Sequence, residues 1–299
     1  MSSIKKVAII GKGNVGSAAL AELLKNGLDV TVISRFSHEM PAGARAVQAD
    51  YSSIDSLSSA LKGHDAVVST VGAAGIVGQK DIIDAAILAG VKRFIPSDYG
   101  SVSADPQARD EPTFLPFIKI QDYLKEKAAA GMIEYTILST GPFLDLVFAT
   151  PLFVNFHTRS VEFYGDGKLR LSSTSIAGVG KAVAGVLLNA DKTRNRVLHI
   201  QETVVSQVKV LDLAKTVAPE GAEWKEISVD PVETLEAARA NAAKDTGNII
   251  ALYALIKAIM LSGKYETEYR QVDNDLIGLA QLTDEDLKAQ FVPLLARQP

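Results

Sequence analysis

VAIIGKGNVG, residues 7–16, decides the fold of this chain. Its four leading apolar residues are typical of a short buried strand, and an amphipathic helical pattern over residues 14–26 follows at once. The turn between them fits the pattern G-x-G-x-x-G and consists of Gly11, Lys12, Gly13, Asn14, Val15 and Gly16. In this context Gly11 permits the tight turn, Gly13 lets the backbone approach a pyrophosphate, and Gly16 lets the helix pack close to the sheet. The stretch predicts a dinucleotide-binding turn, and a glycine-rich turn without a ligand is the alternative.

The same alternation of short apolar runs and helical patterns continues to about residue 140. Six strands are predicted at residues 7–10, 30–34, 46–50, 66–71, 93–97 and 135–140, and helices at 14–26, 53–62, 80–89 and 116–130. Most of the strands are apolar on both faces, as expected where helices cover both sides of a parallel sheet. The predicted fold is therefore α/β, a doubly wound parallel-sheet Rossmann domain.

The regular alternation of predicted strands and helices ends after Gly141. Residues 161–173 read as a hairpin that turns at Gly165-Asp166-Gly167, and a helix at 175–189, a strand at 196–200 and a helix at 206–217 follow. The last third is amphipathic and helical, including the apolar stretch 248–261. We expect a Rossmann domain over residues 1–150 and, over 151–299, a smaller and mainly helical substrate-binding lobe packed on it.

Composition excludes several classes of protein and partner. The 299 residues are 47% hydrophobic and 22% charged, which is typical of a folded soluble chain, and 31 Lys and Arg against 35 Asp and Glu argue against a nucleic-acid partner. Cysteine is absent, and the four histidines show no metal-ligand spacing, so we expect no metal site. No signal peptide and no apolar run of about 20 residues is present, so we expect no membrane contact and a cytoplasmic location.

The end of the second predicted strand indicates which dinucleotide binds. Sites that prefer NAD place an acidic residue there, whereas this strand ends Ser34-Arg35-Phe36-Ser37. Arg35 offers a planar set of donors for a 2'-phosphate, with Ser34 and Ser37 as neutral donors. Lys12 adds a second positive charge near that phosphate or points into solvent. We therefore expect NADP(H).

Two further strand ends belong to the same edge of the sheet. The fourth strand ends at Ser69-Thr70-Val71-Gly72, and small residues follow it. The fifth ends at Pro96-Ser97-Asp98-Tyr99-Gly100. Because ligands of doubly wound sheets bind beyond the carboxyl ends of the strands, we expect Thr70, Val71, Gly72 and Ser97 to contact the cofactor, although each also fits an ordinary turn.

Lys119 is the residue that we expect to carry the chemistry. Tyr123 and Lys127 match the Tyr-x-x-x-Lys spacing of short-chain reductases, but Lys127 lies only eight residues before the next strand and so near the far edge of the sheet. Lys119 lies eight residues earlier, about 12 Å nearer the cofactor edge. It is a candidate proton donor, with Tyr123 on the same helix face lining the pocket. A solvated basic helix face is the alternative.

Several stretches together resemble the isoflavone reductase-like branch of the NmrA-like family, a group of atypical short-chain dehydrogenases. They are STVG at 69–72, Gln79, IIDAAILAGVKRFIPSDYG at 82–100, FIK at 117–119 ahead of YTIL, and, more weakly, LTDEDL near Leu282. The resemblance covers at least the first 145 residues. It implies an enzyme that uses NADPH to reduce small, often aromatic or phenolic compounds.

The resemblance also assigns roles to individual residues. Lys119 occupies the place of the catalytic lysine, Arg35 that of the arginine on the 2'-phosphate, and Gln79 that of a glutamine near the nicotinamide. Gly141, Pro142 and Phe143 correspond to the loop under the nicotinamide. Two departures stand out: Ile10 and Lys12 replace a glycine and a threonine of the family's turn, and the segment 100–119 differs from the plant reductases. Specificity for plant isoflavonoids is therefore not implied.

Two functions follow from these residues. The first is an NADPH-dependent reductase of a small, largely apolar or aromatic carbonyl, enone or benzylic substrate bound between the two lobes. The alternative is a non-catalytic NADP(H)-binding sensor of the NmrA type, and Lys119 at the cofactor edge favours the first. The predicted partner is a small molecule, and the apolar helix 248–261 fits either a pocket lid or a homodimer contact.

Overall fold

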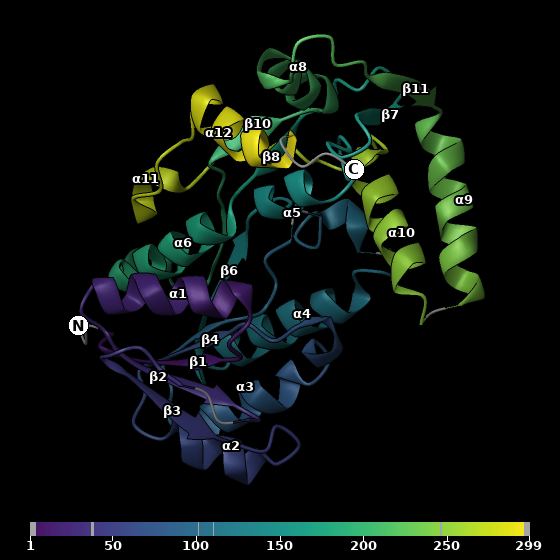
Figure 1. Cartoon of the computed structure of the whole chain (residues 1–299). Coiled ribbons are helices and arrows are strands. Elements are labelled where there is room, and N and C mark those ends of the chain that lie inside the picture. Colours follow the sequence, from purple (N-terminus) through teal and green to yellow (C-terminus); the bar gives the residue numbers. More distant parts are fainter. Residues whose placement is uncertain (1–3, 37–38, 101, 110, 246, 296–299) are drawn as a thin grey trace.

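A seven-stranded parallel sheet forms the centre of the computed structural model (Figure 1). The structure describes residues 4–36, 39–100, 102–109, 111–245 and 247–295. The strand order is β3-β2-β1-β4-β5-β6-β9. The strands are β1 (Lys6–Ile10), β2 (Asp29–Ser34), β3 (Ala44–Gln48), β4 (Ala66–Ser69), β5 (Arg93–Ile95), β6 (Glu134–Ser139) and β9 (Arg196–His199). All six strands predicted for the first half are confirmed, with ends that shift by up to two residues.

Helices cover both faces of this sheet (Figure 1). On one face lie α1 (Asn14–Lys25) and α6 (Ile176–Leu188), and on the other lie α2 (Ile54–Leu61), α3 (Gln79–Leu88) and α4 (Leu115–Ala129). Each face has its own apolar core, built from the buried strand residues and the inner sides of the helices. At the α1–α6 contact, a Cβ on Gly180 would lie 2.6 Å from the backbone of Ala18, so glycine allows this close packing. The predicted doubly wound α/β class is confirmed.

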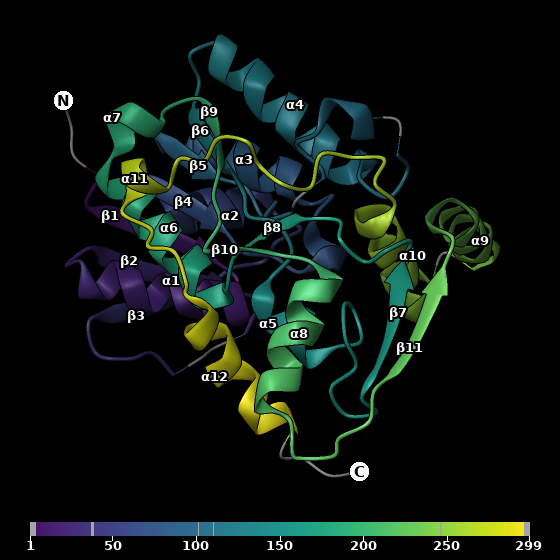
Figure 2. The same cartoon turned by 90° about the horizontal axis from the view of Figure 1, so that it is seen from above.

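The C-terminal elements lie beyond the α1 and α6 face of the sheet (Figures 1 and 2). They build a third apolar core. The rings of Phe148, Phe156 and Phe291 pack together at its centre. No helix of the described ranges is both long and apolar enough to cross a lipid bilayer. The remaining elements are α5 (Leu144–Ala149), β7 (Ser160–Tyr164), β8 (Leu171–Ser173), α7 (Ala190–Thr193), β10 (Thr203–Val205), α8 (Gln207–Val217), β11 (Lys225–Val229), α9 (Pro231–Lys244), α10 (Ile249–Leu261), α11 (Asn274–Ile277) and α12 (Asp284–Leu295).

The predicted hairpin over residues 161–173 is wrong. Gly165 and Gly167 do adopt the positive φ angles of a turn, +63° and +68°, but the two flanking strands do not pair with each other. β7 pairs in parallel with β11, and β8 pairs in antiparallel with β10. The local alternation of side chains predicted two strands and a turn, whereas partners 30 or more residues away along the chain decided the pairing.

The predicted division of the chain at residue 150 stays a prediction. Two elements beyond that residue belong to the sheet layer: α6 packs on α1, and β9 pairs with β6 at the edge of the sheet. The chain therefore leaves the sheet after β6, builds α5, β7 and β8, and returns to the sheet before forming the rest of the C-terminal core.

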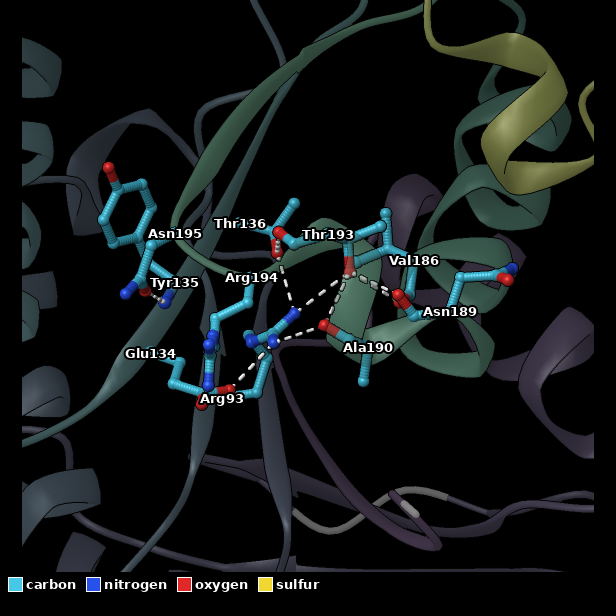
Figure 3. A network of polar contacts seen from close by, with 10 residues as sticks. All are labelled: Arg93, Glu134, Tyr135, Thr136, Val186, Asn189, Ala190, Thr193, Arg194 and Asn195. Carbon is cyan, nitrogen blue, oxygen red and sulfur yellow. Dashed lines mark hydrogen bonds and ion pairs between the residues drawn. The ribbon is translucent and has the colours of Figure 1, made fainter. Parts of the chain in front are cut away.

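A buried arginine fastens α7 to the sheet (Figure 3). Arg93 in β5 is 1% exposed, and its guanidinium donates to the hydroxyls of Thr136 and Thr193 at 3.0 and 3.1 Å. It also donates to the carboxylate of Glu134 at 2.8 Å and to the backbone oxygen of Ala190 at 2.7 Å. One side chain thus joins β5, β6 and the α7 turn at the edge of the sheet opposite the glycine turn.

Replacing Arg93 with methionine is expected to lower the free energy of unfolding by about 3 kcal/mol, because four hydrogen bonds of a buried guanidinium are lost together. Urea unfolding followed by circular dichroism measures this loss. The matched control is Arg194→Met, whose exposed guanidinium contacts the same Glu134 at 3.4 Å and should change the free energy of unfolding by less than about 1 kcal/mol. Equal losses for the two variants would contradict a structural role of the Arg93 network.

Candidate cofactor site and active site

The three glycines of the turn after β1 have different surroundings. Gly11 has a φ of +97°, and a Cβ there would lie 2.9 Å from the backbone oxygen of Thr70. A Cβ on Gly16 would lie 2.4 Å from the backbone oxygen of Gly11. A Cβ on Gly13 would have no neighbour within 4 Å among the described residues. Packing therefore requires Gly11 and Gly16, whereas the face of Gly13 is open to a ligand.

The N-terminus of α1 offers free backbone donors at this turn. The helix begins after Gly13 with no side-chain cap from the described residues and no acidic residue in its first turn. By contrast, Ser175 and Ser206 cap α6 and α8. Unpaired N–H groups and the positive end of the helix dipole bind anions, and a pyrophosphate fits this place. The turn thus has the room and the donors for the predicted dinucleotide.

Thr70 holds the turn in place from the neighbouring strand end. Its hydroxyl lies 3.1 Å from the backbone oxygen of Ile10 and 2.9 Å from that of Gly11, and donates to this pair. Gly72, two residues on, is exposed. Val71 accepts a hydrogen bond at its backbone oxygen from the Ser97 hydroxyl at 2.8 Å. The structure therefore brings together the residues at the ends of β4 and β5, Thr70, Val71, Gly72 and Ser97, which we call the rim. Their contacts with a cofactor stay predictions.

Gln79 is completely buried, and its side chain forms hydrogen bonds with the backbone of Ser97. Its side-chain oxygen accepts from the N–H of Ser97 at 2.7 Å, and its amide donates to the backbone oxygen of Ser97 at 3.4 Å. These bonds tie the start of α3 to the end of β5. Gln79 shapes the rim in this way, and its predicted place near the nicotinamide is not tested by these contacts.

Arg35 and Lys12 lie near the ends of β2 and β1. The guanidinium of Arg35 is 5.8 and 6.0 Å from the ring centres of Phe36 and Tyr51, and its side chain is exposed. Burial raises the pKa of Tyr51 to about 12, so the phenol stays neutral. The ammonium of Lys12 donates to the backbone oxygen of Glu39 at 2.8 Å. The Ser34 hydroxyl donates to the backbone oxygen of Phe36, and Ser37 lies outside the described residues.

Lys119 is exposed in the second turn of α4. The buried side of this helix consists of Ile118, Ile120, Gln121 and Leu124. Lys119 is directed away from this side, because successive helix residues turn by about 100°. Within the described ranges no hydrogen bond or ion pair of its ammonium is found. Its predicted position beside the nicotinamide stays a proposal.

Tyr123 contacts helix α3. Its hydroxyl donates to the carboxylate of Asp84, and the ammonium groups of Lys80 and Lys127 each lie 4.7 Å from its ring centre. These contacts give Tyr123 a structural place between α3 and α4. Its predicted role in lining the pocket has no support from these contacts and stays a prediction.

One buried carboxylate of the rim was not singled out from the sequence. Asp98 is 2% exposed, and its two oxygens accept from the Ser103 hydroxyl and the Gln121 amide, both at 2.6 Å. Burial raises the pKa of this carboxyl, and the hydrogen bonds oppose that shift. Asp98 thereby joins the end of β5 to the buried side of α4. An aspartate next to the predicted strand end was the available signal. In the described part of the chain no group of three or more His, Asp and Glu is placed to hold a metal ion.

The loop 141–143 packs against the C-terminal part of the chain. Gly141 has a φ of +67°, and a Cβ there would lie 1.7 Å from the backbone oxygen of Ser172. Pro142 accepts at its backbone oxygen from the Ser173 hydroxyl at 2.5 Å, and Phe143 is half-buried. The N–H of Gly141 donates to the hydroxyl of Tyr269 at 3.0 Å. Tyr269 was missed in the sequence, although Tyr265, Thr267 and Tyr269 alternate with charged residues as in an extended buried segment.

The fold and this edge define a Rossmann-type protein that binds a dinucleotide. The family model described as NAD(P)H-binding matches residues 11–190. Oxidoreductase aprR of Aspergillus flavus is 31% identical over 290 residues, which are 93% of this chain and 95% of the relative. The isoflavone reductase homolog P3 of Arabidopsis thaliana is 30% identical over 213 residues, 64% of this chain and 66% of the relative. The solved complex of leucoanthocyanidin reductase with NADPH from Vitis vinifera has a TM-score of 0.76 at 18% identity, covering 96% of this chain and 99% of that one.

The chain belongs to the NAD(P)H-binding family and is an oxidoreductase. The resemblance to the isoflavone reductase-like enzymes is confirmed, as is the predicted cofactor class, NAD(P)H.

Proposed function

We propose that this oxidoreductase is an NADPH-dependent reductase of a small, largely apolar or aromatic carbonyl, enone or benzylic substrate. The observation that carries the proposal is the open face of Gly13 below the uncapped N-terminus of α1, with the exposed Arg35 at the end of the neighbouring strand. A pyrophosphate fits the first feature, and a 2'-phosphate fits the guanidinium.

The residues of the chain have separate tasks in this proposal. The bound cofactor supplies the hydride. Arg35 binds the 2'-phosphate, and the network of Thr70, Gln79 and Ser97 keeps the rim rigid beside the nicotinamide. Lys119 donates a proton to the reduced substrate or polarises the atom that receives it. The loop 141–143 supports the nicotinamide from below.

The proposed substrate class has support from the names of the relatives. Leucoanthocyanidin reductase and the isoflavone reductase homolog carry names of aromatic, phenolic compounds. In this chain Val102, Ala108 and Phe114, from the segment between Gly100 and Lys119, pack into the apolar C-terminal core. The further proposals are a cytoplasmic location and a homodimer through the exposed Ile249, Ile250 and Tyr253 of α10.

A panel of aromatic enones, quinones, ketones and benzylic ethers tests the proposed reaction. Substrate-dependent loss of NADPH absorbance is expected for at least one class, with far slower loss of NADH absorbance. Tight binding of NADPH with no turnover of any class would instead favour the non-catalytic sensor. Sedimentation of the purified chain decides the proposed homodimer.

Arg35→Ala is expected to weaken NADPH binding by about 1.5 to 3 kcal/mol, roughly ten- to a hundredfold in Kd, because a charge-assisted contact is lost. NADH binding should change little. Titration calorimetry with both dinucleotides measures the difference. Arg45→Ala, an exposed arginine of β3 paired with Asp29, is the matched control and should leave both affinities unchanged. An equal loss for NADPH and NADH in Arg35→Ala would overturn the 2'-phosphate assignment.

A further inference from the structure

An extended segment of the C-terminal part, residues 265–270, crosses the ends of several elements that surround the proposed active site. Figure 2 shows the chain running extended between α10 and α11. Tyr265, Thr267 and Tyr269 are buried with 5%, 3% and 9% exposure. The residues between them face outward, where Glu268 pairs with Arg170 and Arg270 pairs with Glu266. We name residues 265–270 the strap.

Each inward residue of the strap binds a different segment. The hydroxyl of Tyr265 donates to the buried Glu111 at 2.9 Å, in the segment ahead of α4. Thr267 accepts at its backbone oxygen from the N–H of Ser172 at 2.9 Å. Tyr269 reaches the end of β6, where its hydroxyl lies 3.0 Å from both the Ser139 hydroxyl and the Gly141 backbone nitrogen. The strap therefore connects the segment ahead of α4, strand β8 and the end of β6.

Tyr269 is held firmly in this position. Its own N–H donates to the hydroxyl of Ser172 at 2.8 Å, and its ring lies 4.7 Å from the ring centre of His199. The residue is thus held at its backbone and at its ring. Its hydroxyl accepts a hydrogen bond from the buried N–H of Gly141. Gly141 packs closely on β8, because a Cβ on it would lie 1.7 Å from the backbone oxygen of Ser172. The phenol hydroxyl thereby sets where the loop 141–143 begins.

We propose that Tyr269 is a positioning residue, which orients the loop 141–143 and so determines how firmly the nicotinamide half of NADPH is held. The proposal rests on the proposed function, in which that loop supports the nicotinamide. The adenine half, at Arg35 and the glycine turn, lies on other strands and does not depend on this contact. Loss of the hydroxyl should therefore weaken the binding of the nicotinamide half and leave the binding of the adenine half unchanged.

Tyr269→Phe tests this difference between the two halves, because it removes the hydroxyl oxygen and keeps the ring. NADPH and 2',5'-ADP, which carries only the adenine half, are titrated into the native chain and the variant. We expect the Kd of NADPH to rise about five- to tenfold, as for one lost buried hydrogen bond, while the Kd of 2',5'-ADP stays within about twofold. A merely structural loss would weaken both ligands together.

Tyr265→Phe is the matched control, since it removes a buried phenol hydroxyl of the same strap that bonds to Glu111 instead of the loop. It should leave the ratio of the two Kd values unchanged. If Tyr269→Phe does not fold, Ser172→Ala decides, because it removes the acceptor for the Tyr269 N–H and should raise the Kd of NADPH selectively.

The outcomes separate the two proposals. A native chain that binds neither NADPH nor 2',5'-ADP contradicts the proposed function itself. The role of Tyr269 is overturned if the native chain binds both ligands and Tyr269→Phe and Ser172→Ala either leave both Kd values unchanged or raise them equally. The proposed function would then still stand.

Discussion

Lys119→Met is expected to lower kcat about a hundred- to ten-thousandfold with any substrate that the native chain reduces, because the reaction loses its proton donor. Methionine keeps an unbranched side chain of similar length and removes the ammonium group with its protons. Lys119 is exposed and has no hydrogen bond or ion pair within the described ranges, so the free energy of unfolding should change by less than about 0.5 kcal/mol. Steady-state kinetics with saturating NADPH measure kcat, and thermal unfolding confirms the fold.

Lys125→Met is the matched control for this prediction. Lys125 is exposed on the same helix, six residues and about 9 Å further from the start of α4. Its replacement should leave kcat within about twofold of the native value, because the proposal gives it no part in the proton transfer. Full activity of Lys119→Met, with NADPH bound normally, would show that the proton comes from another group.

Gly13→Ala is expected to weaken NADPH binding by at least about a hundredfold while the fold stays intact, because a methyl group would occupy the space that the pyrophosphate needs. The φ and ψ of Gly13, −83° and −164°, suit alanine, and the added Cβ meets no described atom within 4 Å. The free energy of unfolding should therefore change by less than about 1 kcal/mol, because alanine restricts the unfolded chain but is a poorer N-cap residue than glycine.

Gly16→Ala provides the contrast within the same turn. Its Cβ would lie 2.4 Å from the backbone oxygen of Gly11 and 2.6 Å from the Thr70 hydroxyl, so we expect a loss of about 3 kcal/mol in the free energy of unfolding. Titration of NADPH together with urea unfolding of both variants separates space for a ligand from space for packing. Normal NADPH affinity in Gly13→Ala would contradict a pyrophosphate at this turn.

The parallel sheet could be predicted because its signals are local. Residues 7–16 contain a buried strand, a turn and a helix start, and the same order of signals repeats through the strand at 134–139. The pairings of the C-terminal strands could not be predicted in this way. β7 finds its partner in β11, more than 60 residues later, and no alternation within residues 161–173 contains that information.

The residues of the candidate site fall into the same two groups, those placed by local signals and those placed by contacts distant in sequence. The glycine turn, Arg35 and the rim residues follow predicted strands directly, so their common edge follows from the topology of a doubly wound sheet. Tyr269 and Asp98 act through bonds to Gly141 and Gln121, which are distant in sequence. The exposure of Lys119 also depends on how α4 rotates on the sheet, which only the packing of Ile118, Ile120 and Leu124 decides.

A crystal structure of the chain with NADPH tests the central claim most directly, namely that the dinucleotide lies across the glycine turn with Lys119 facing its reactive ring. We predict the pyrophosphate on the backbone N–H groups at the start of α1, the 2'-phosphate on Arg35, and the nicotinamide over the loop 141–143 with the ammonium of Lys119 facing C4. A nicotinamide elsewhere, or a Lys119 ammonium in open solvent away from C4, would contradict the account.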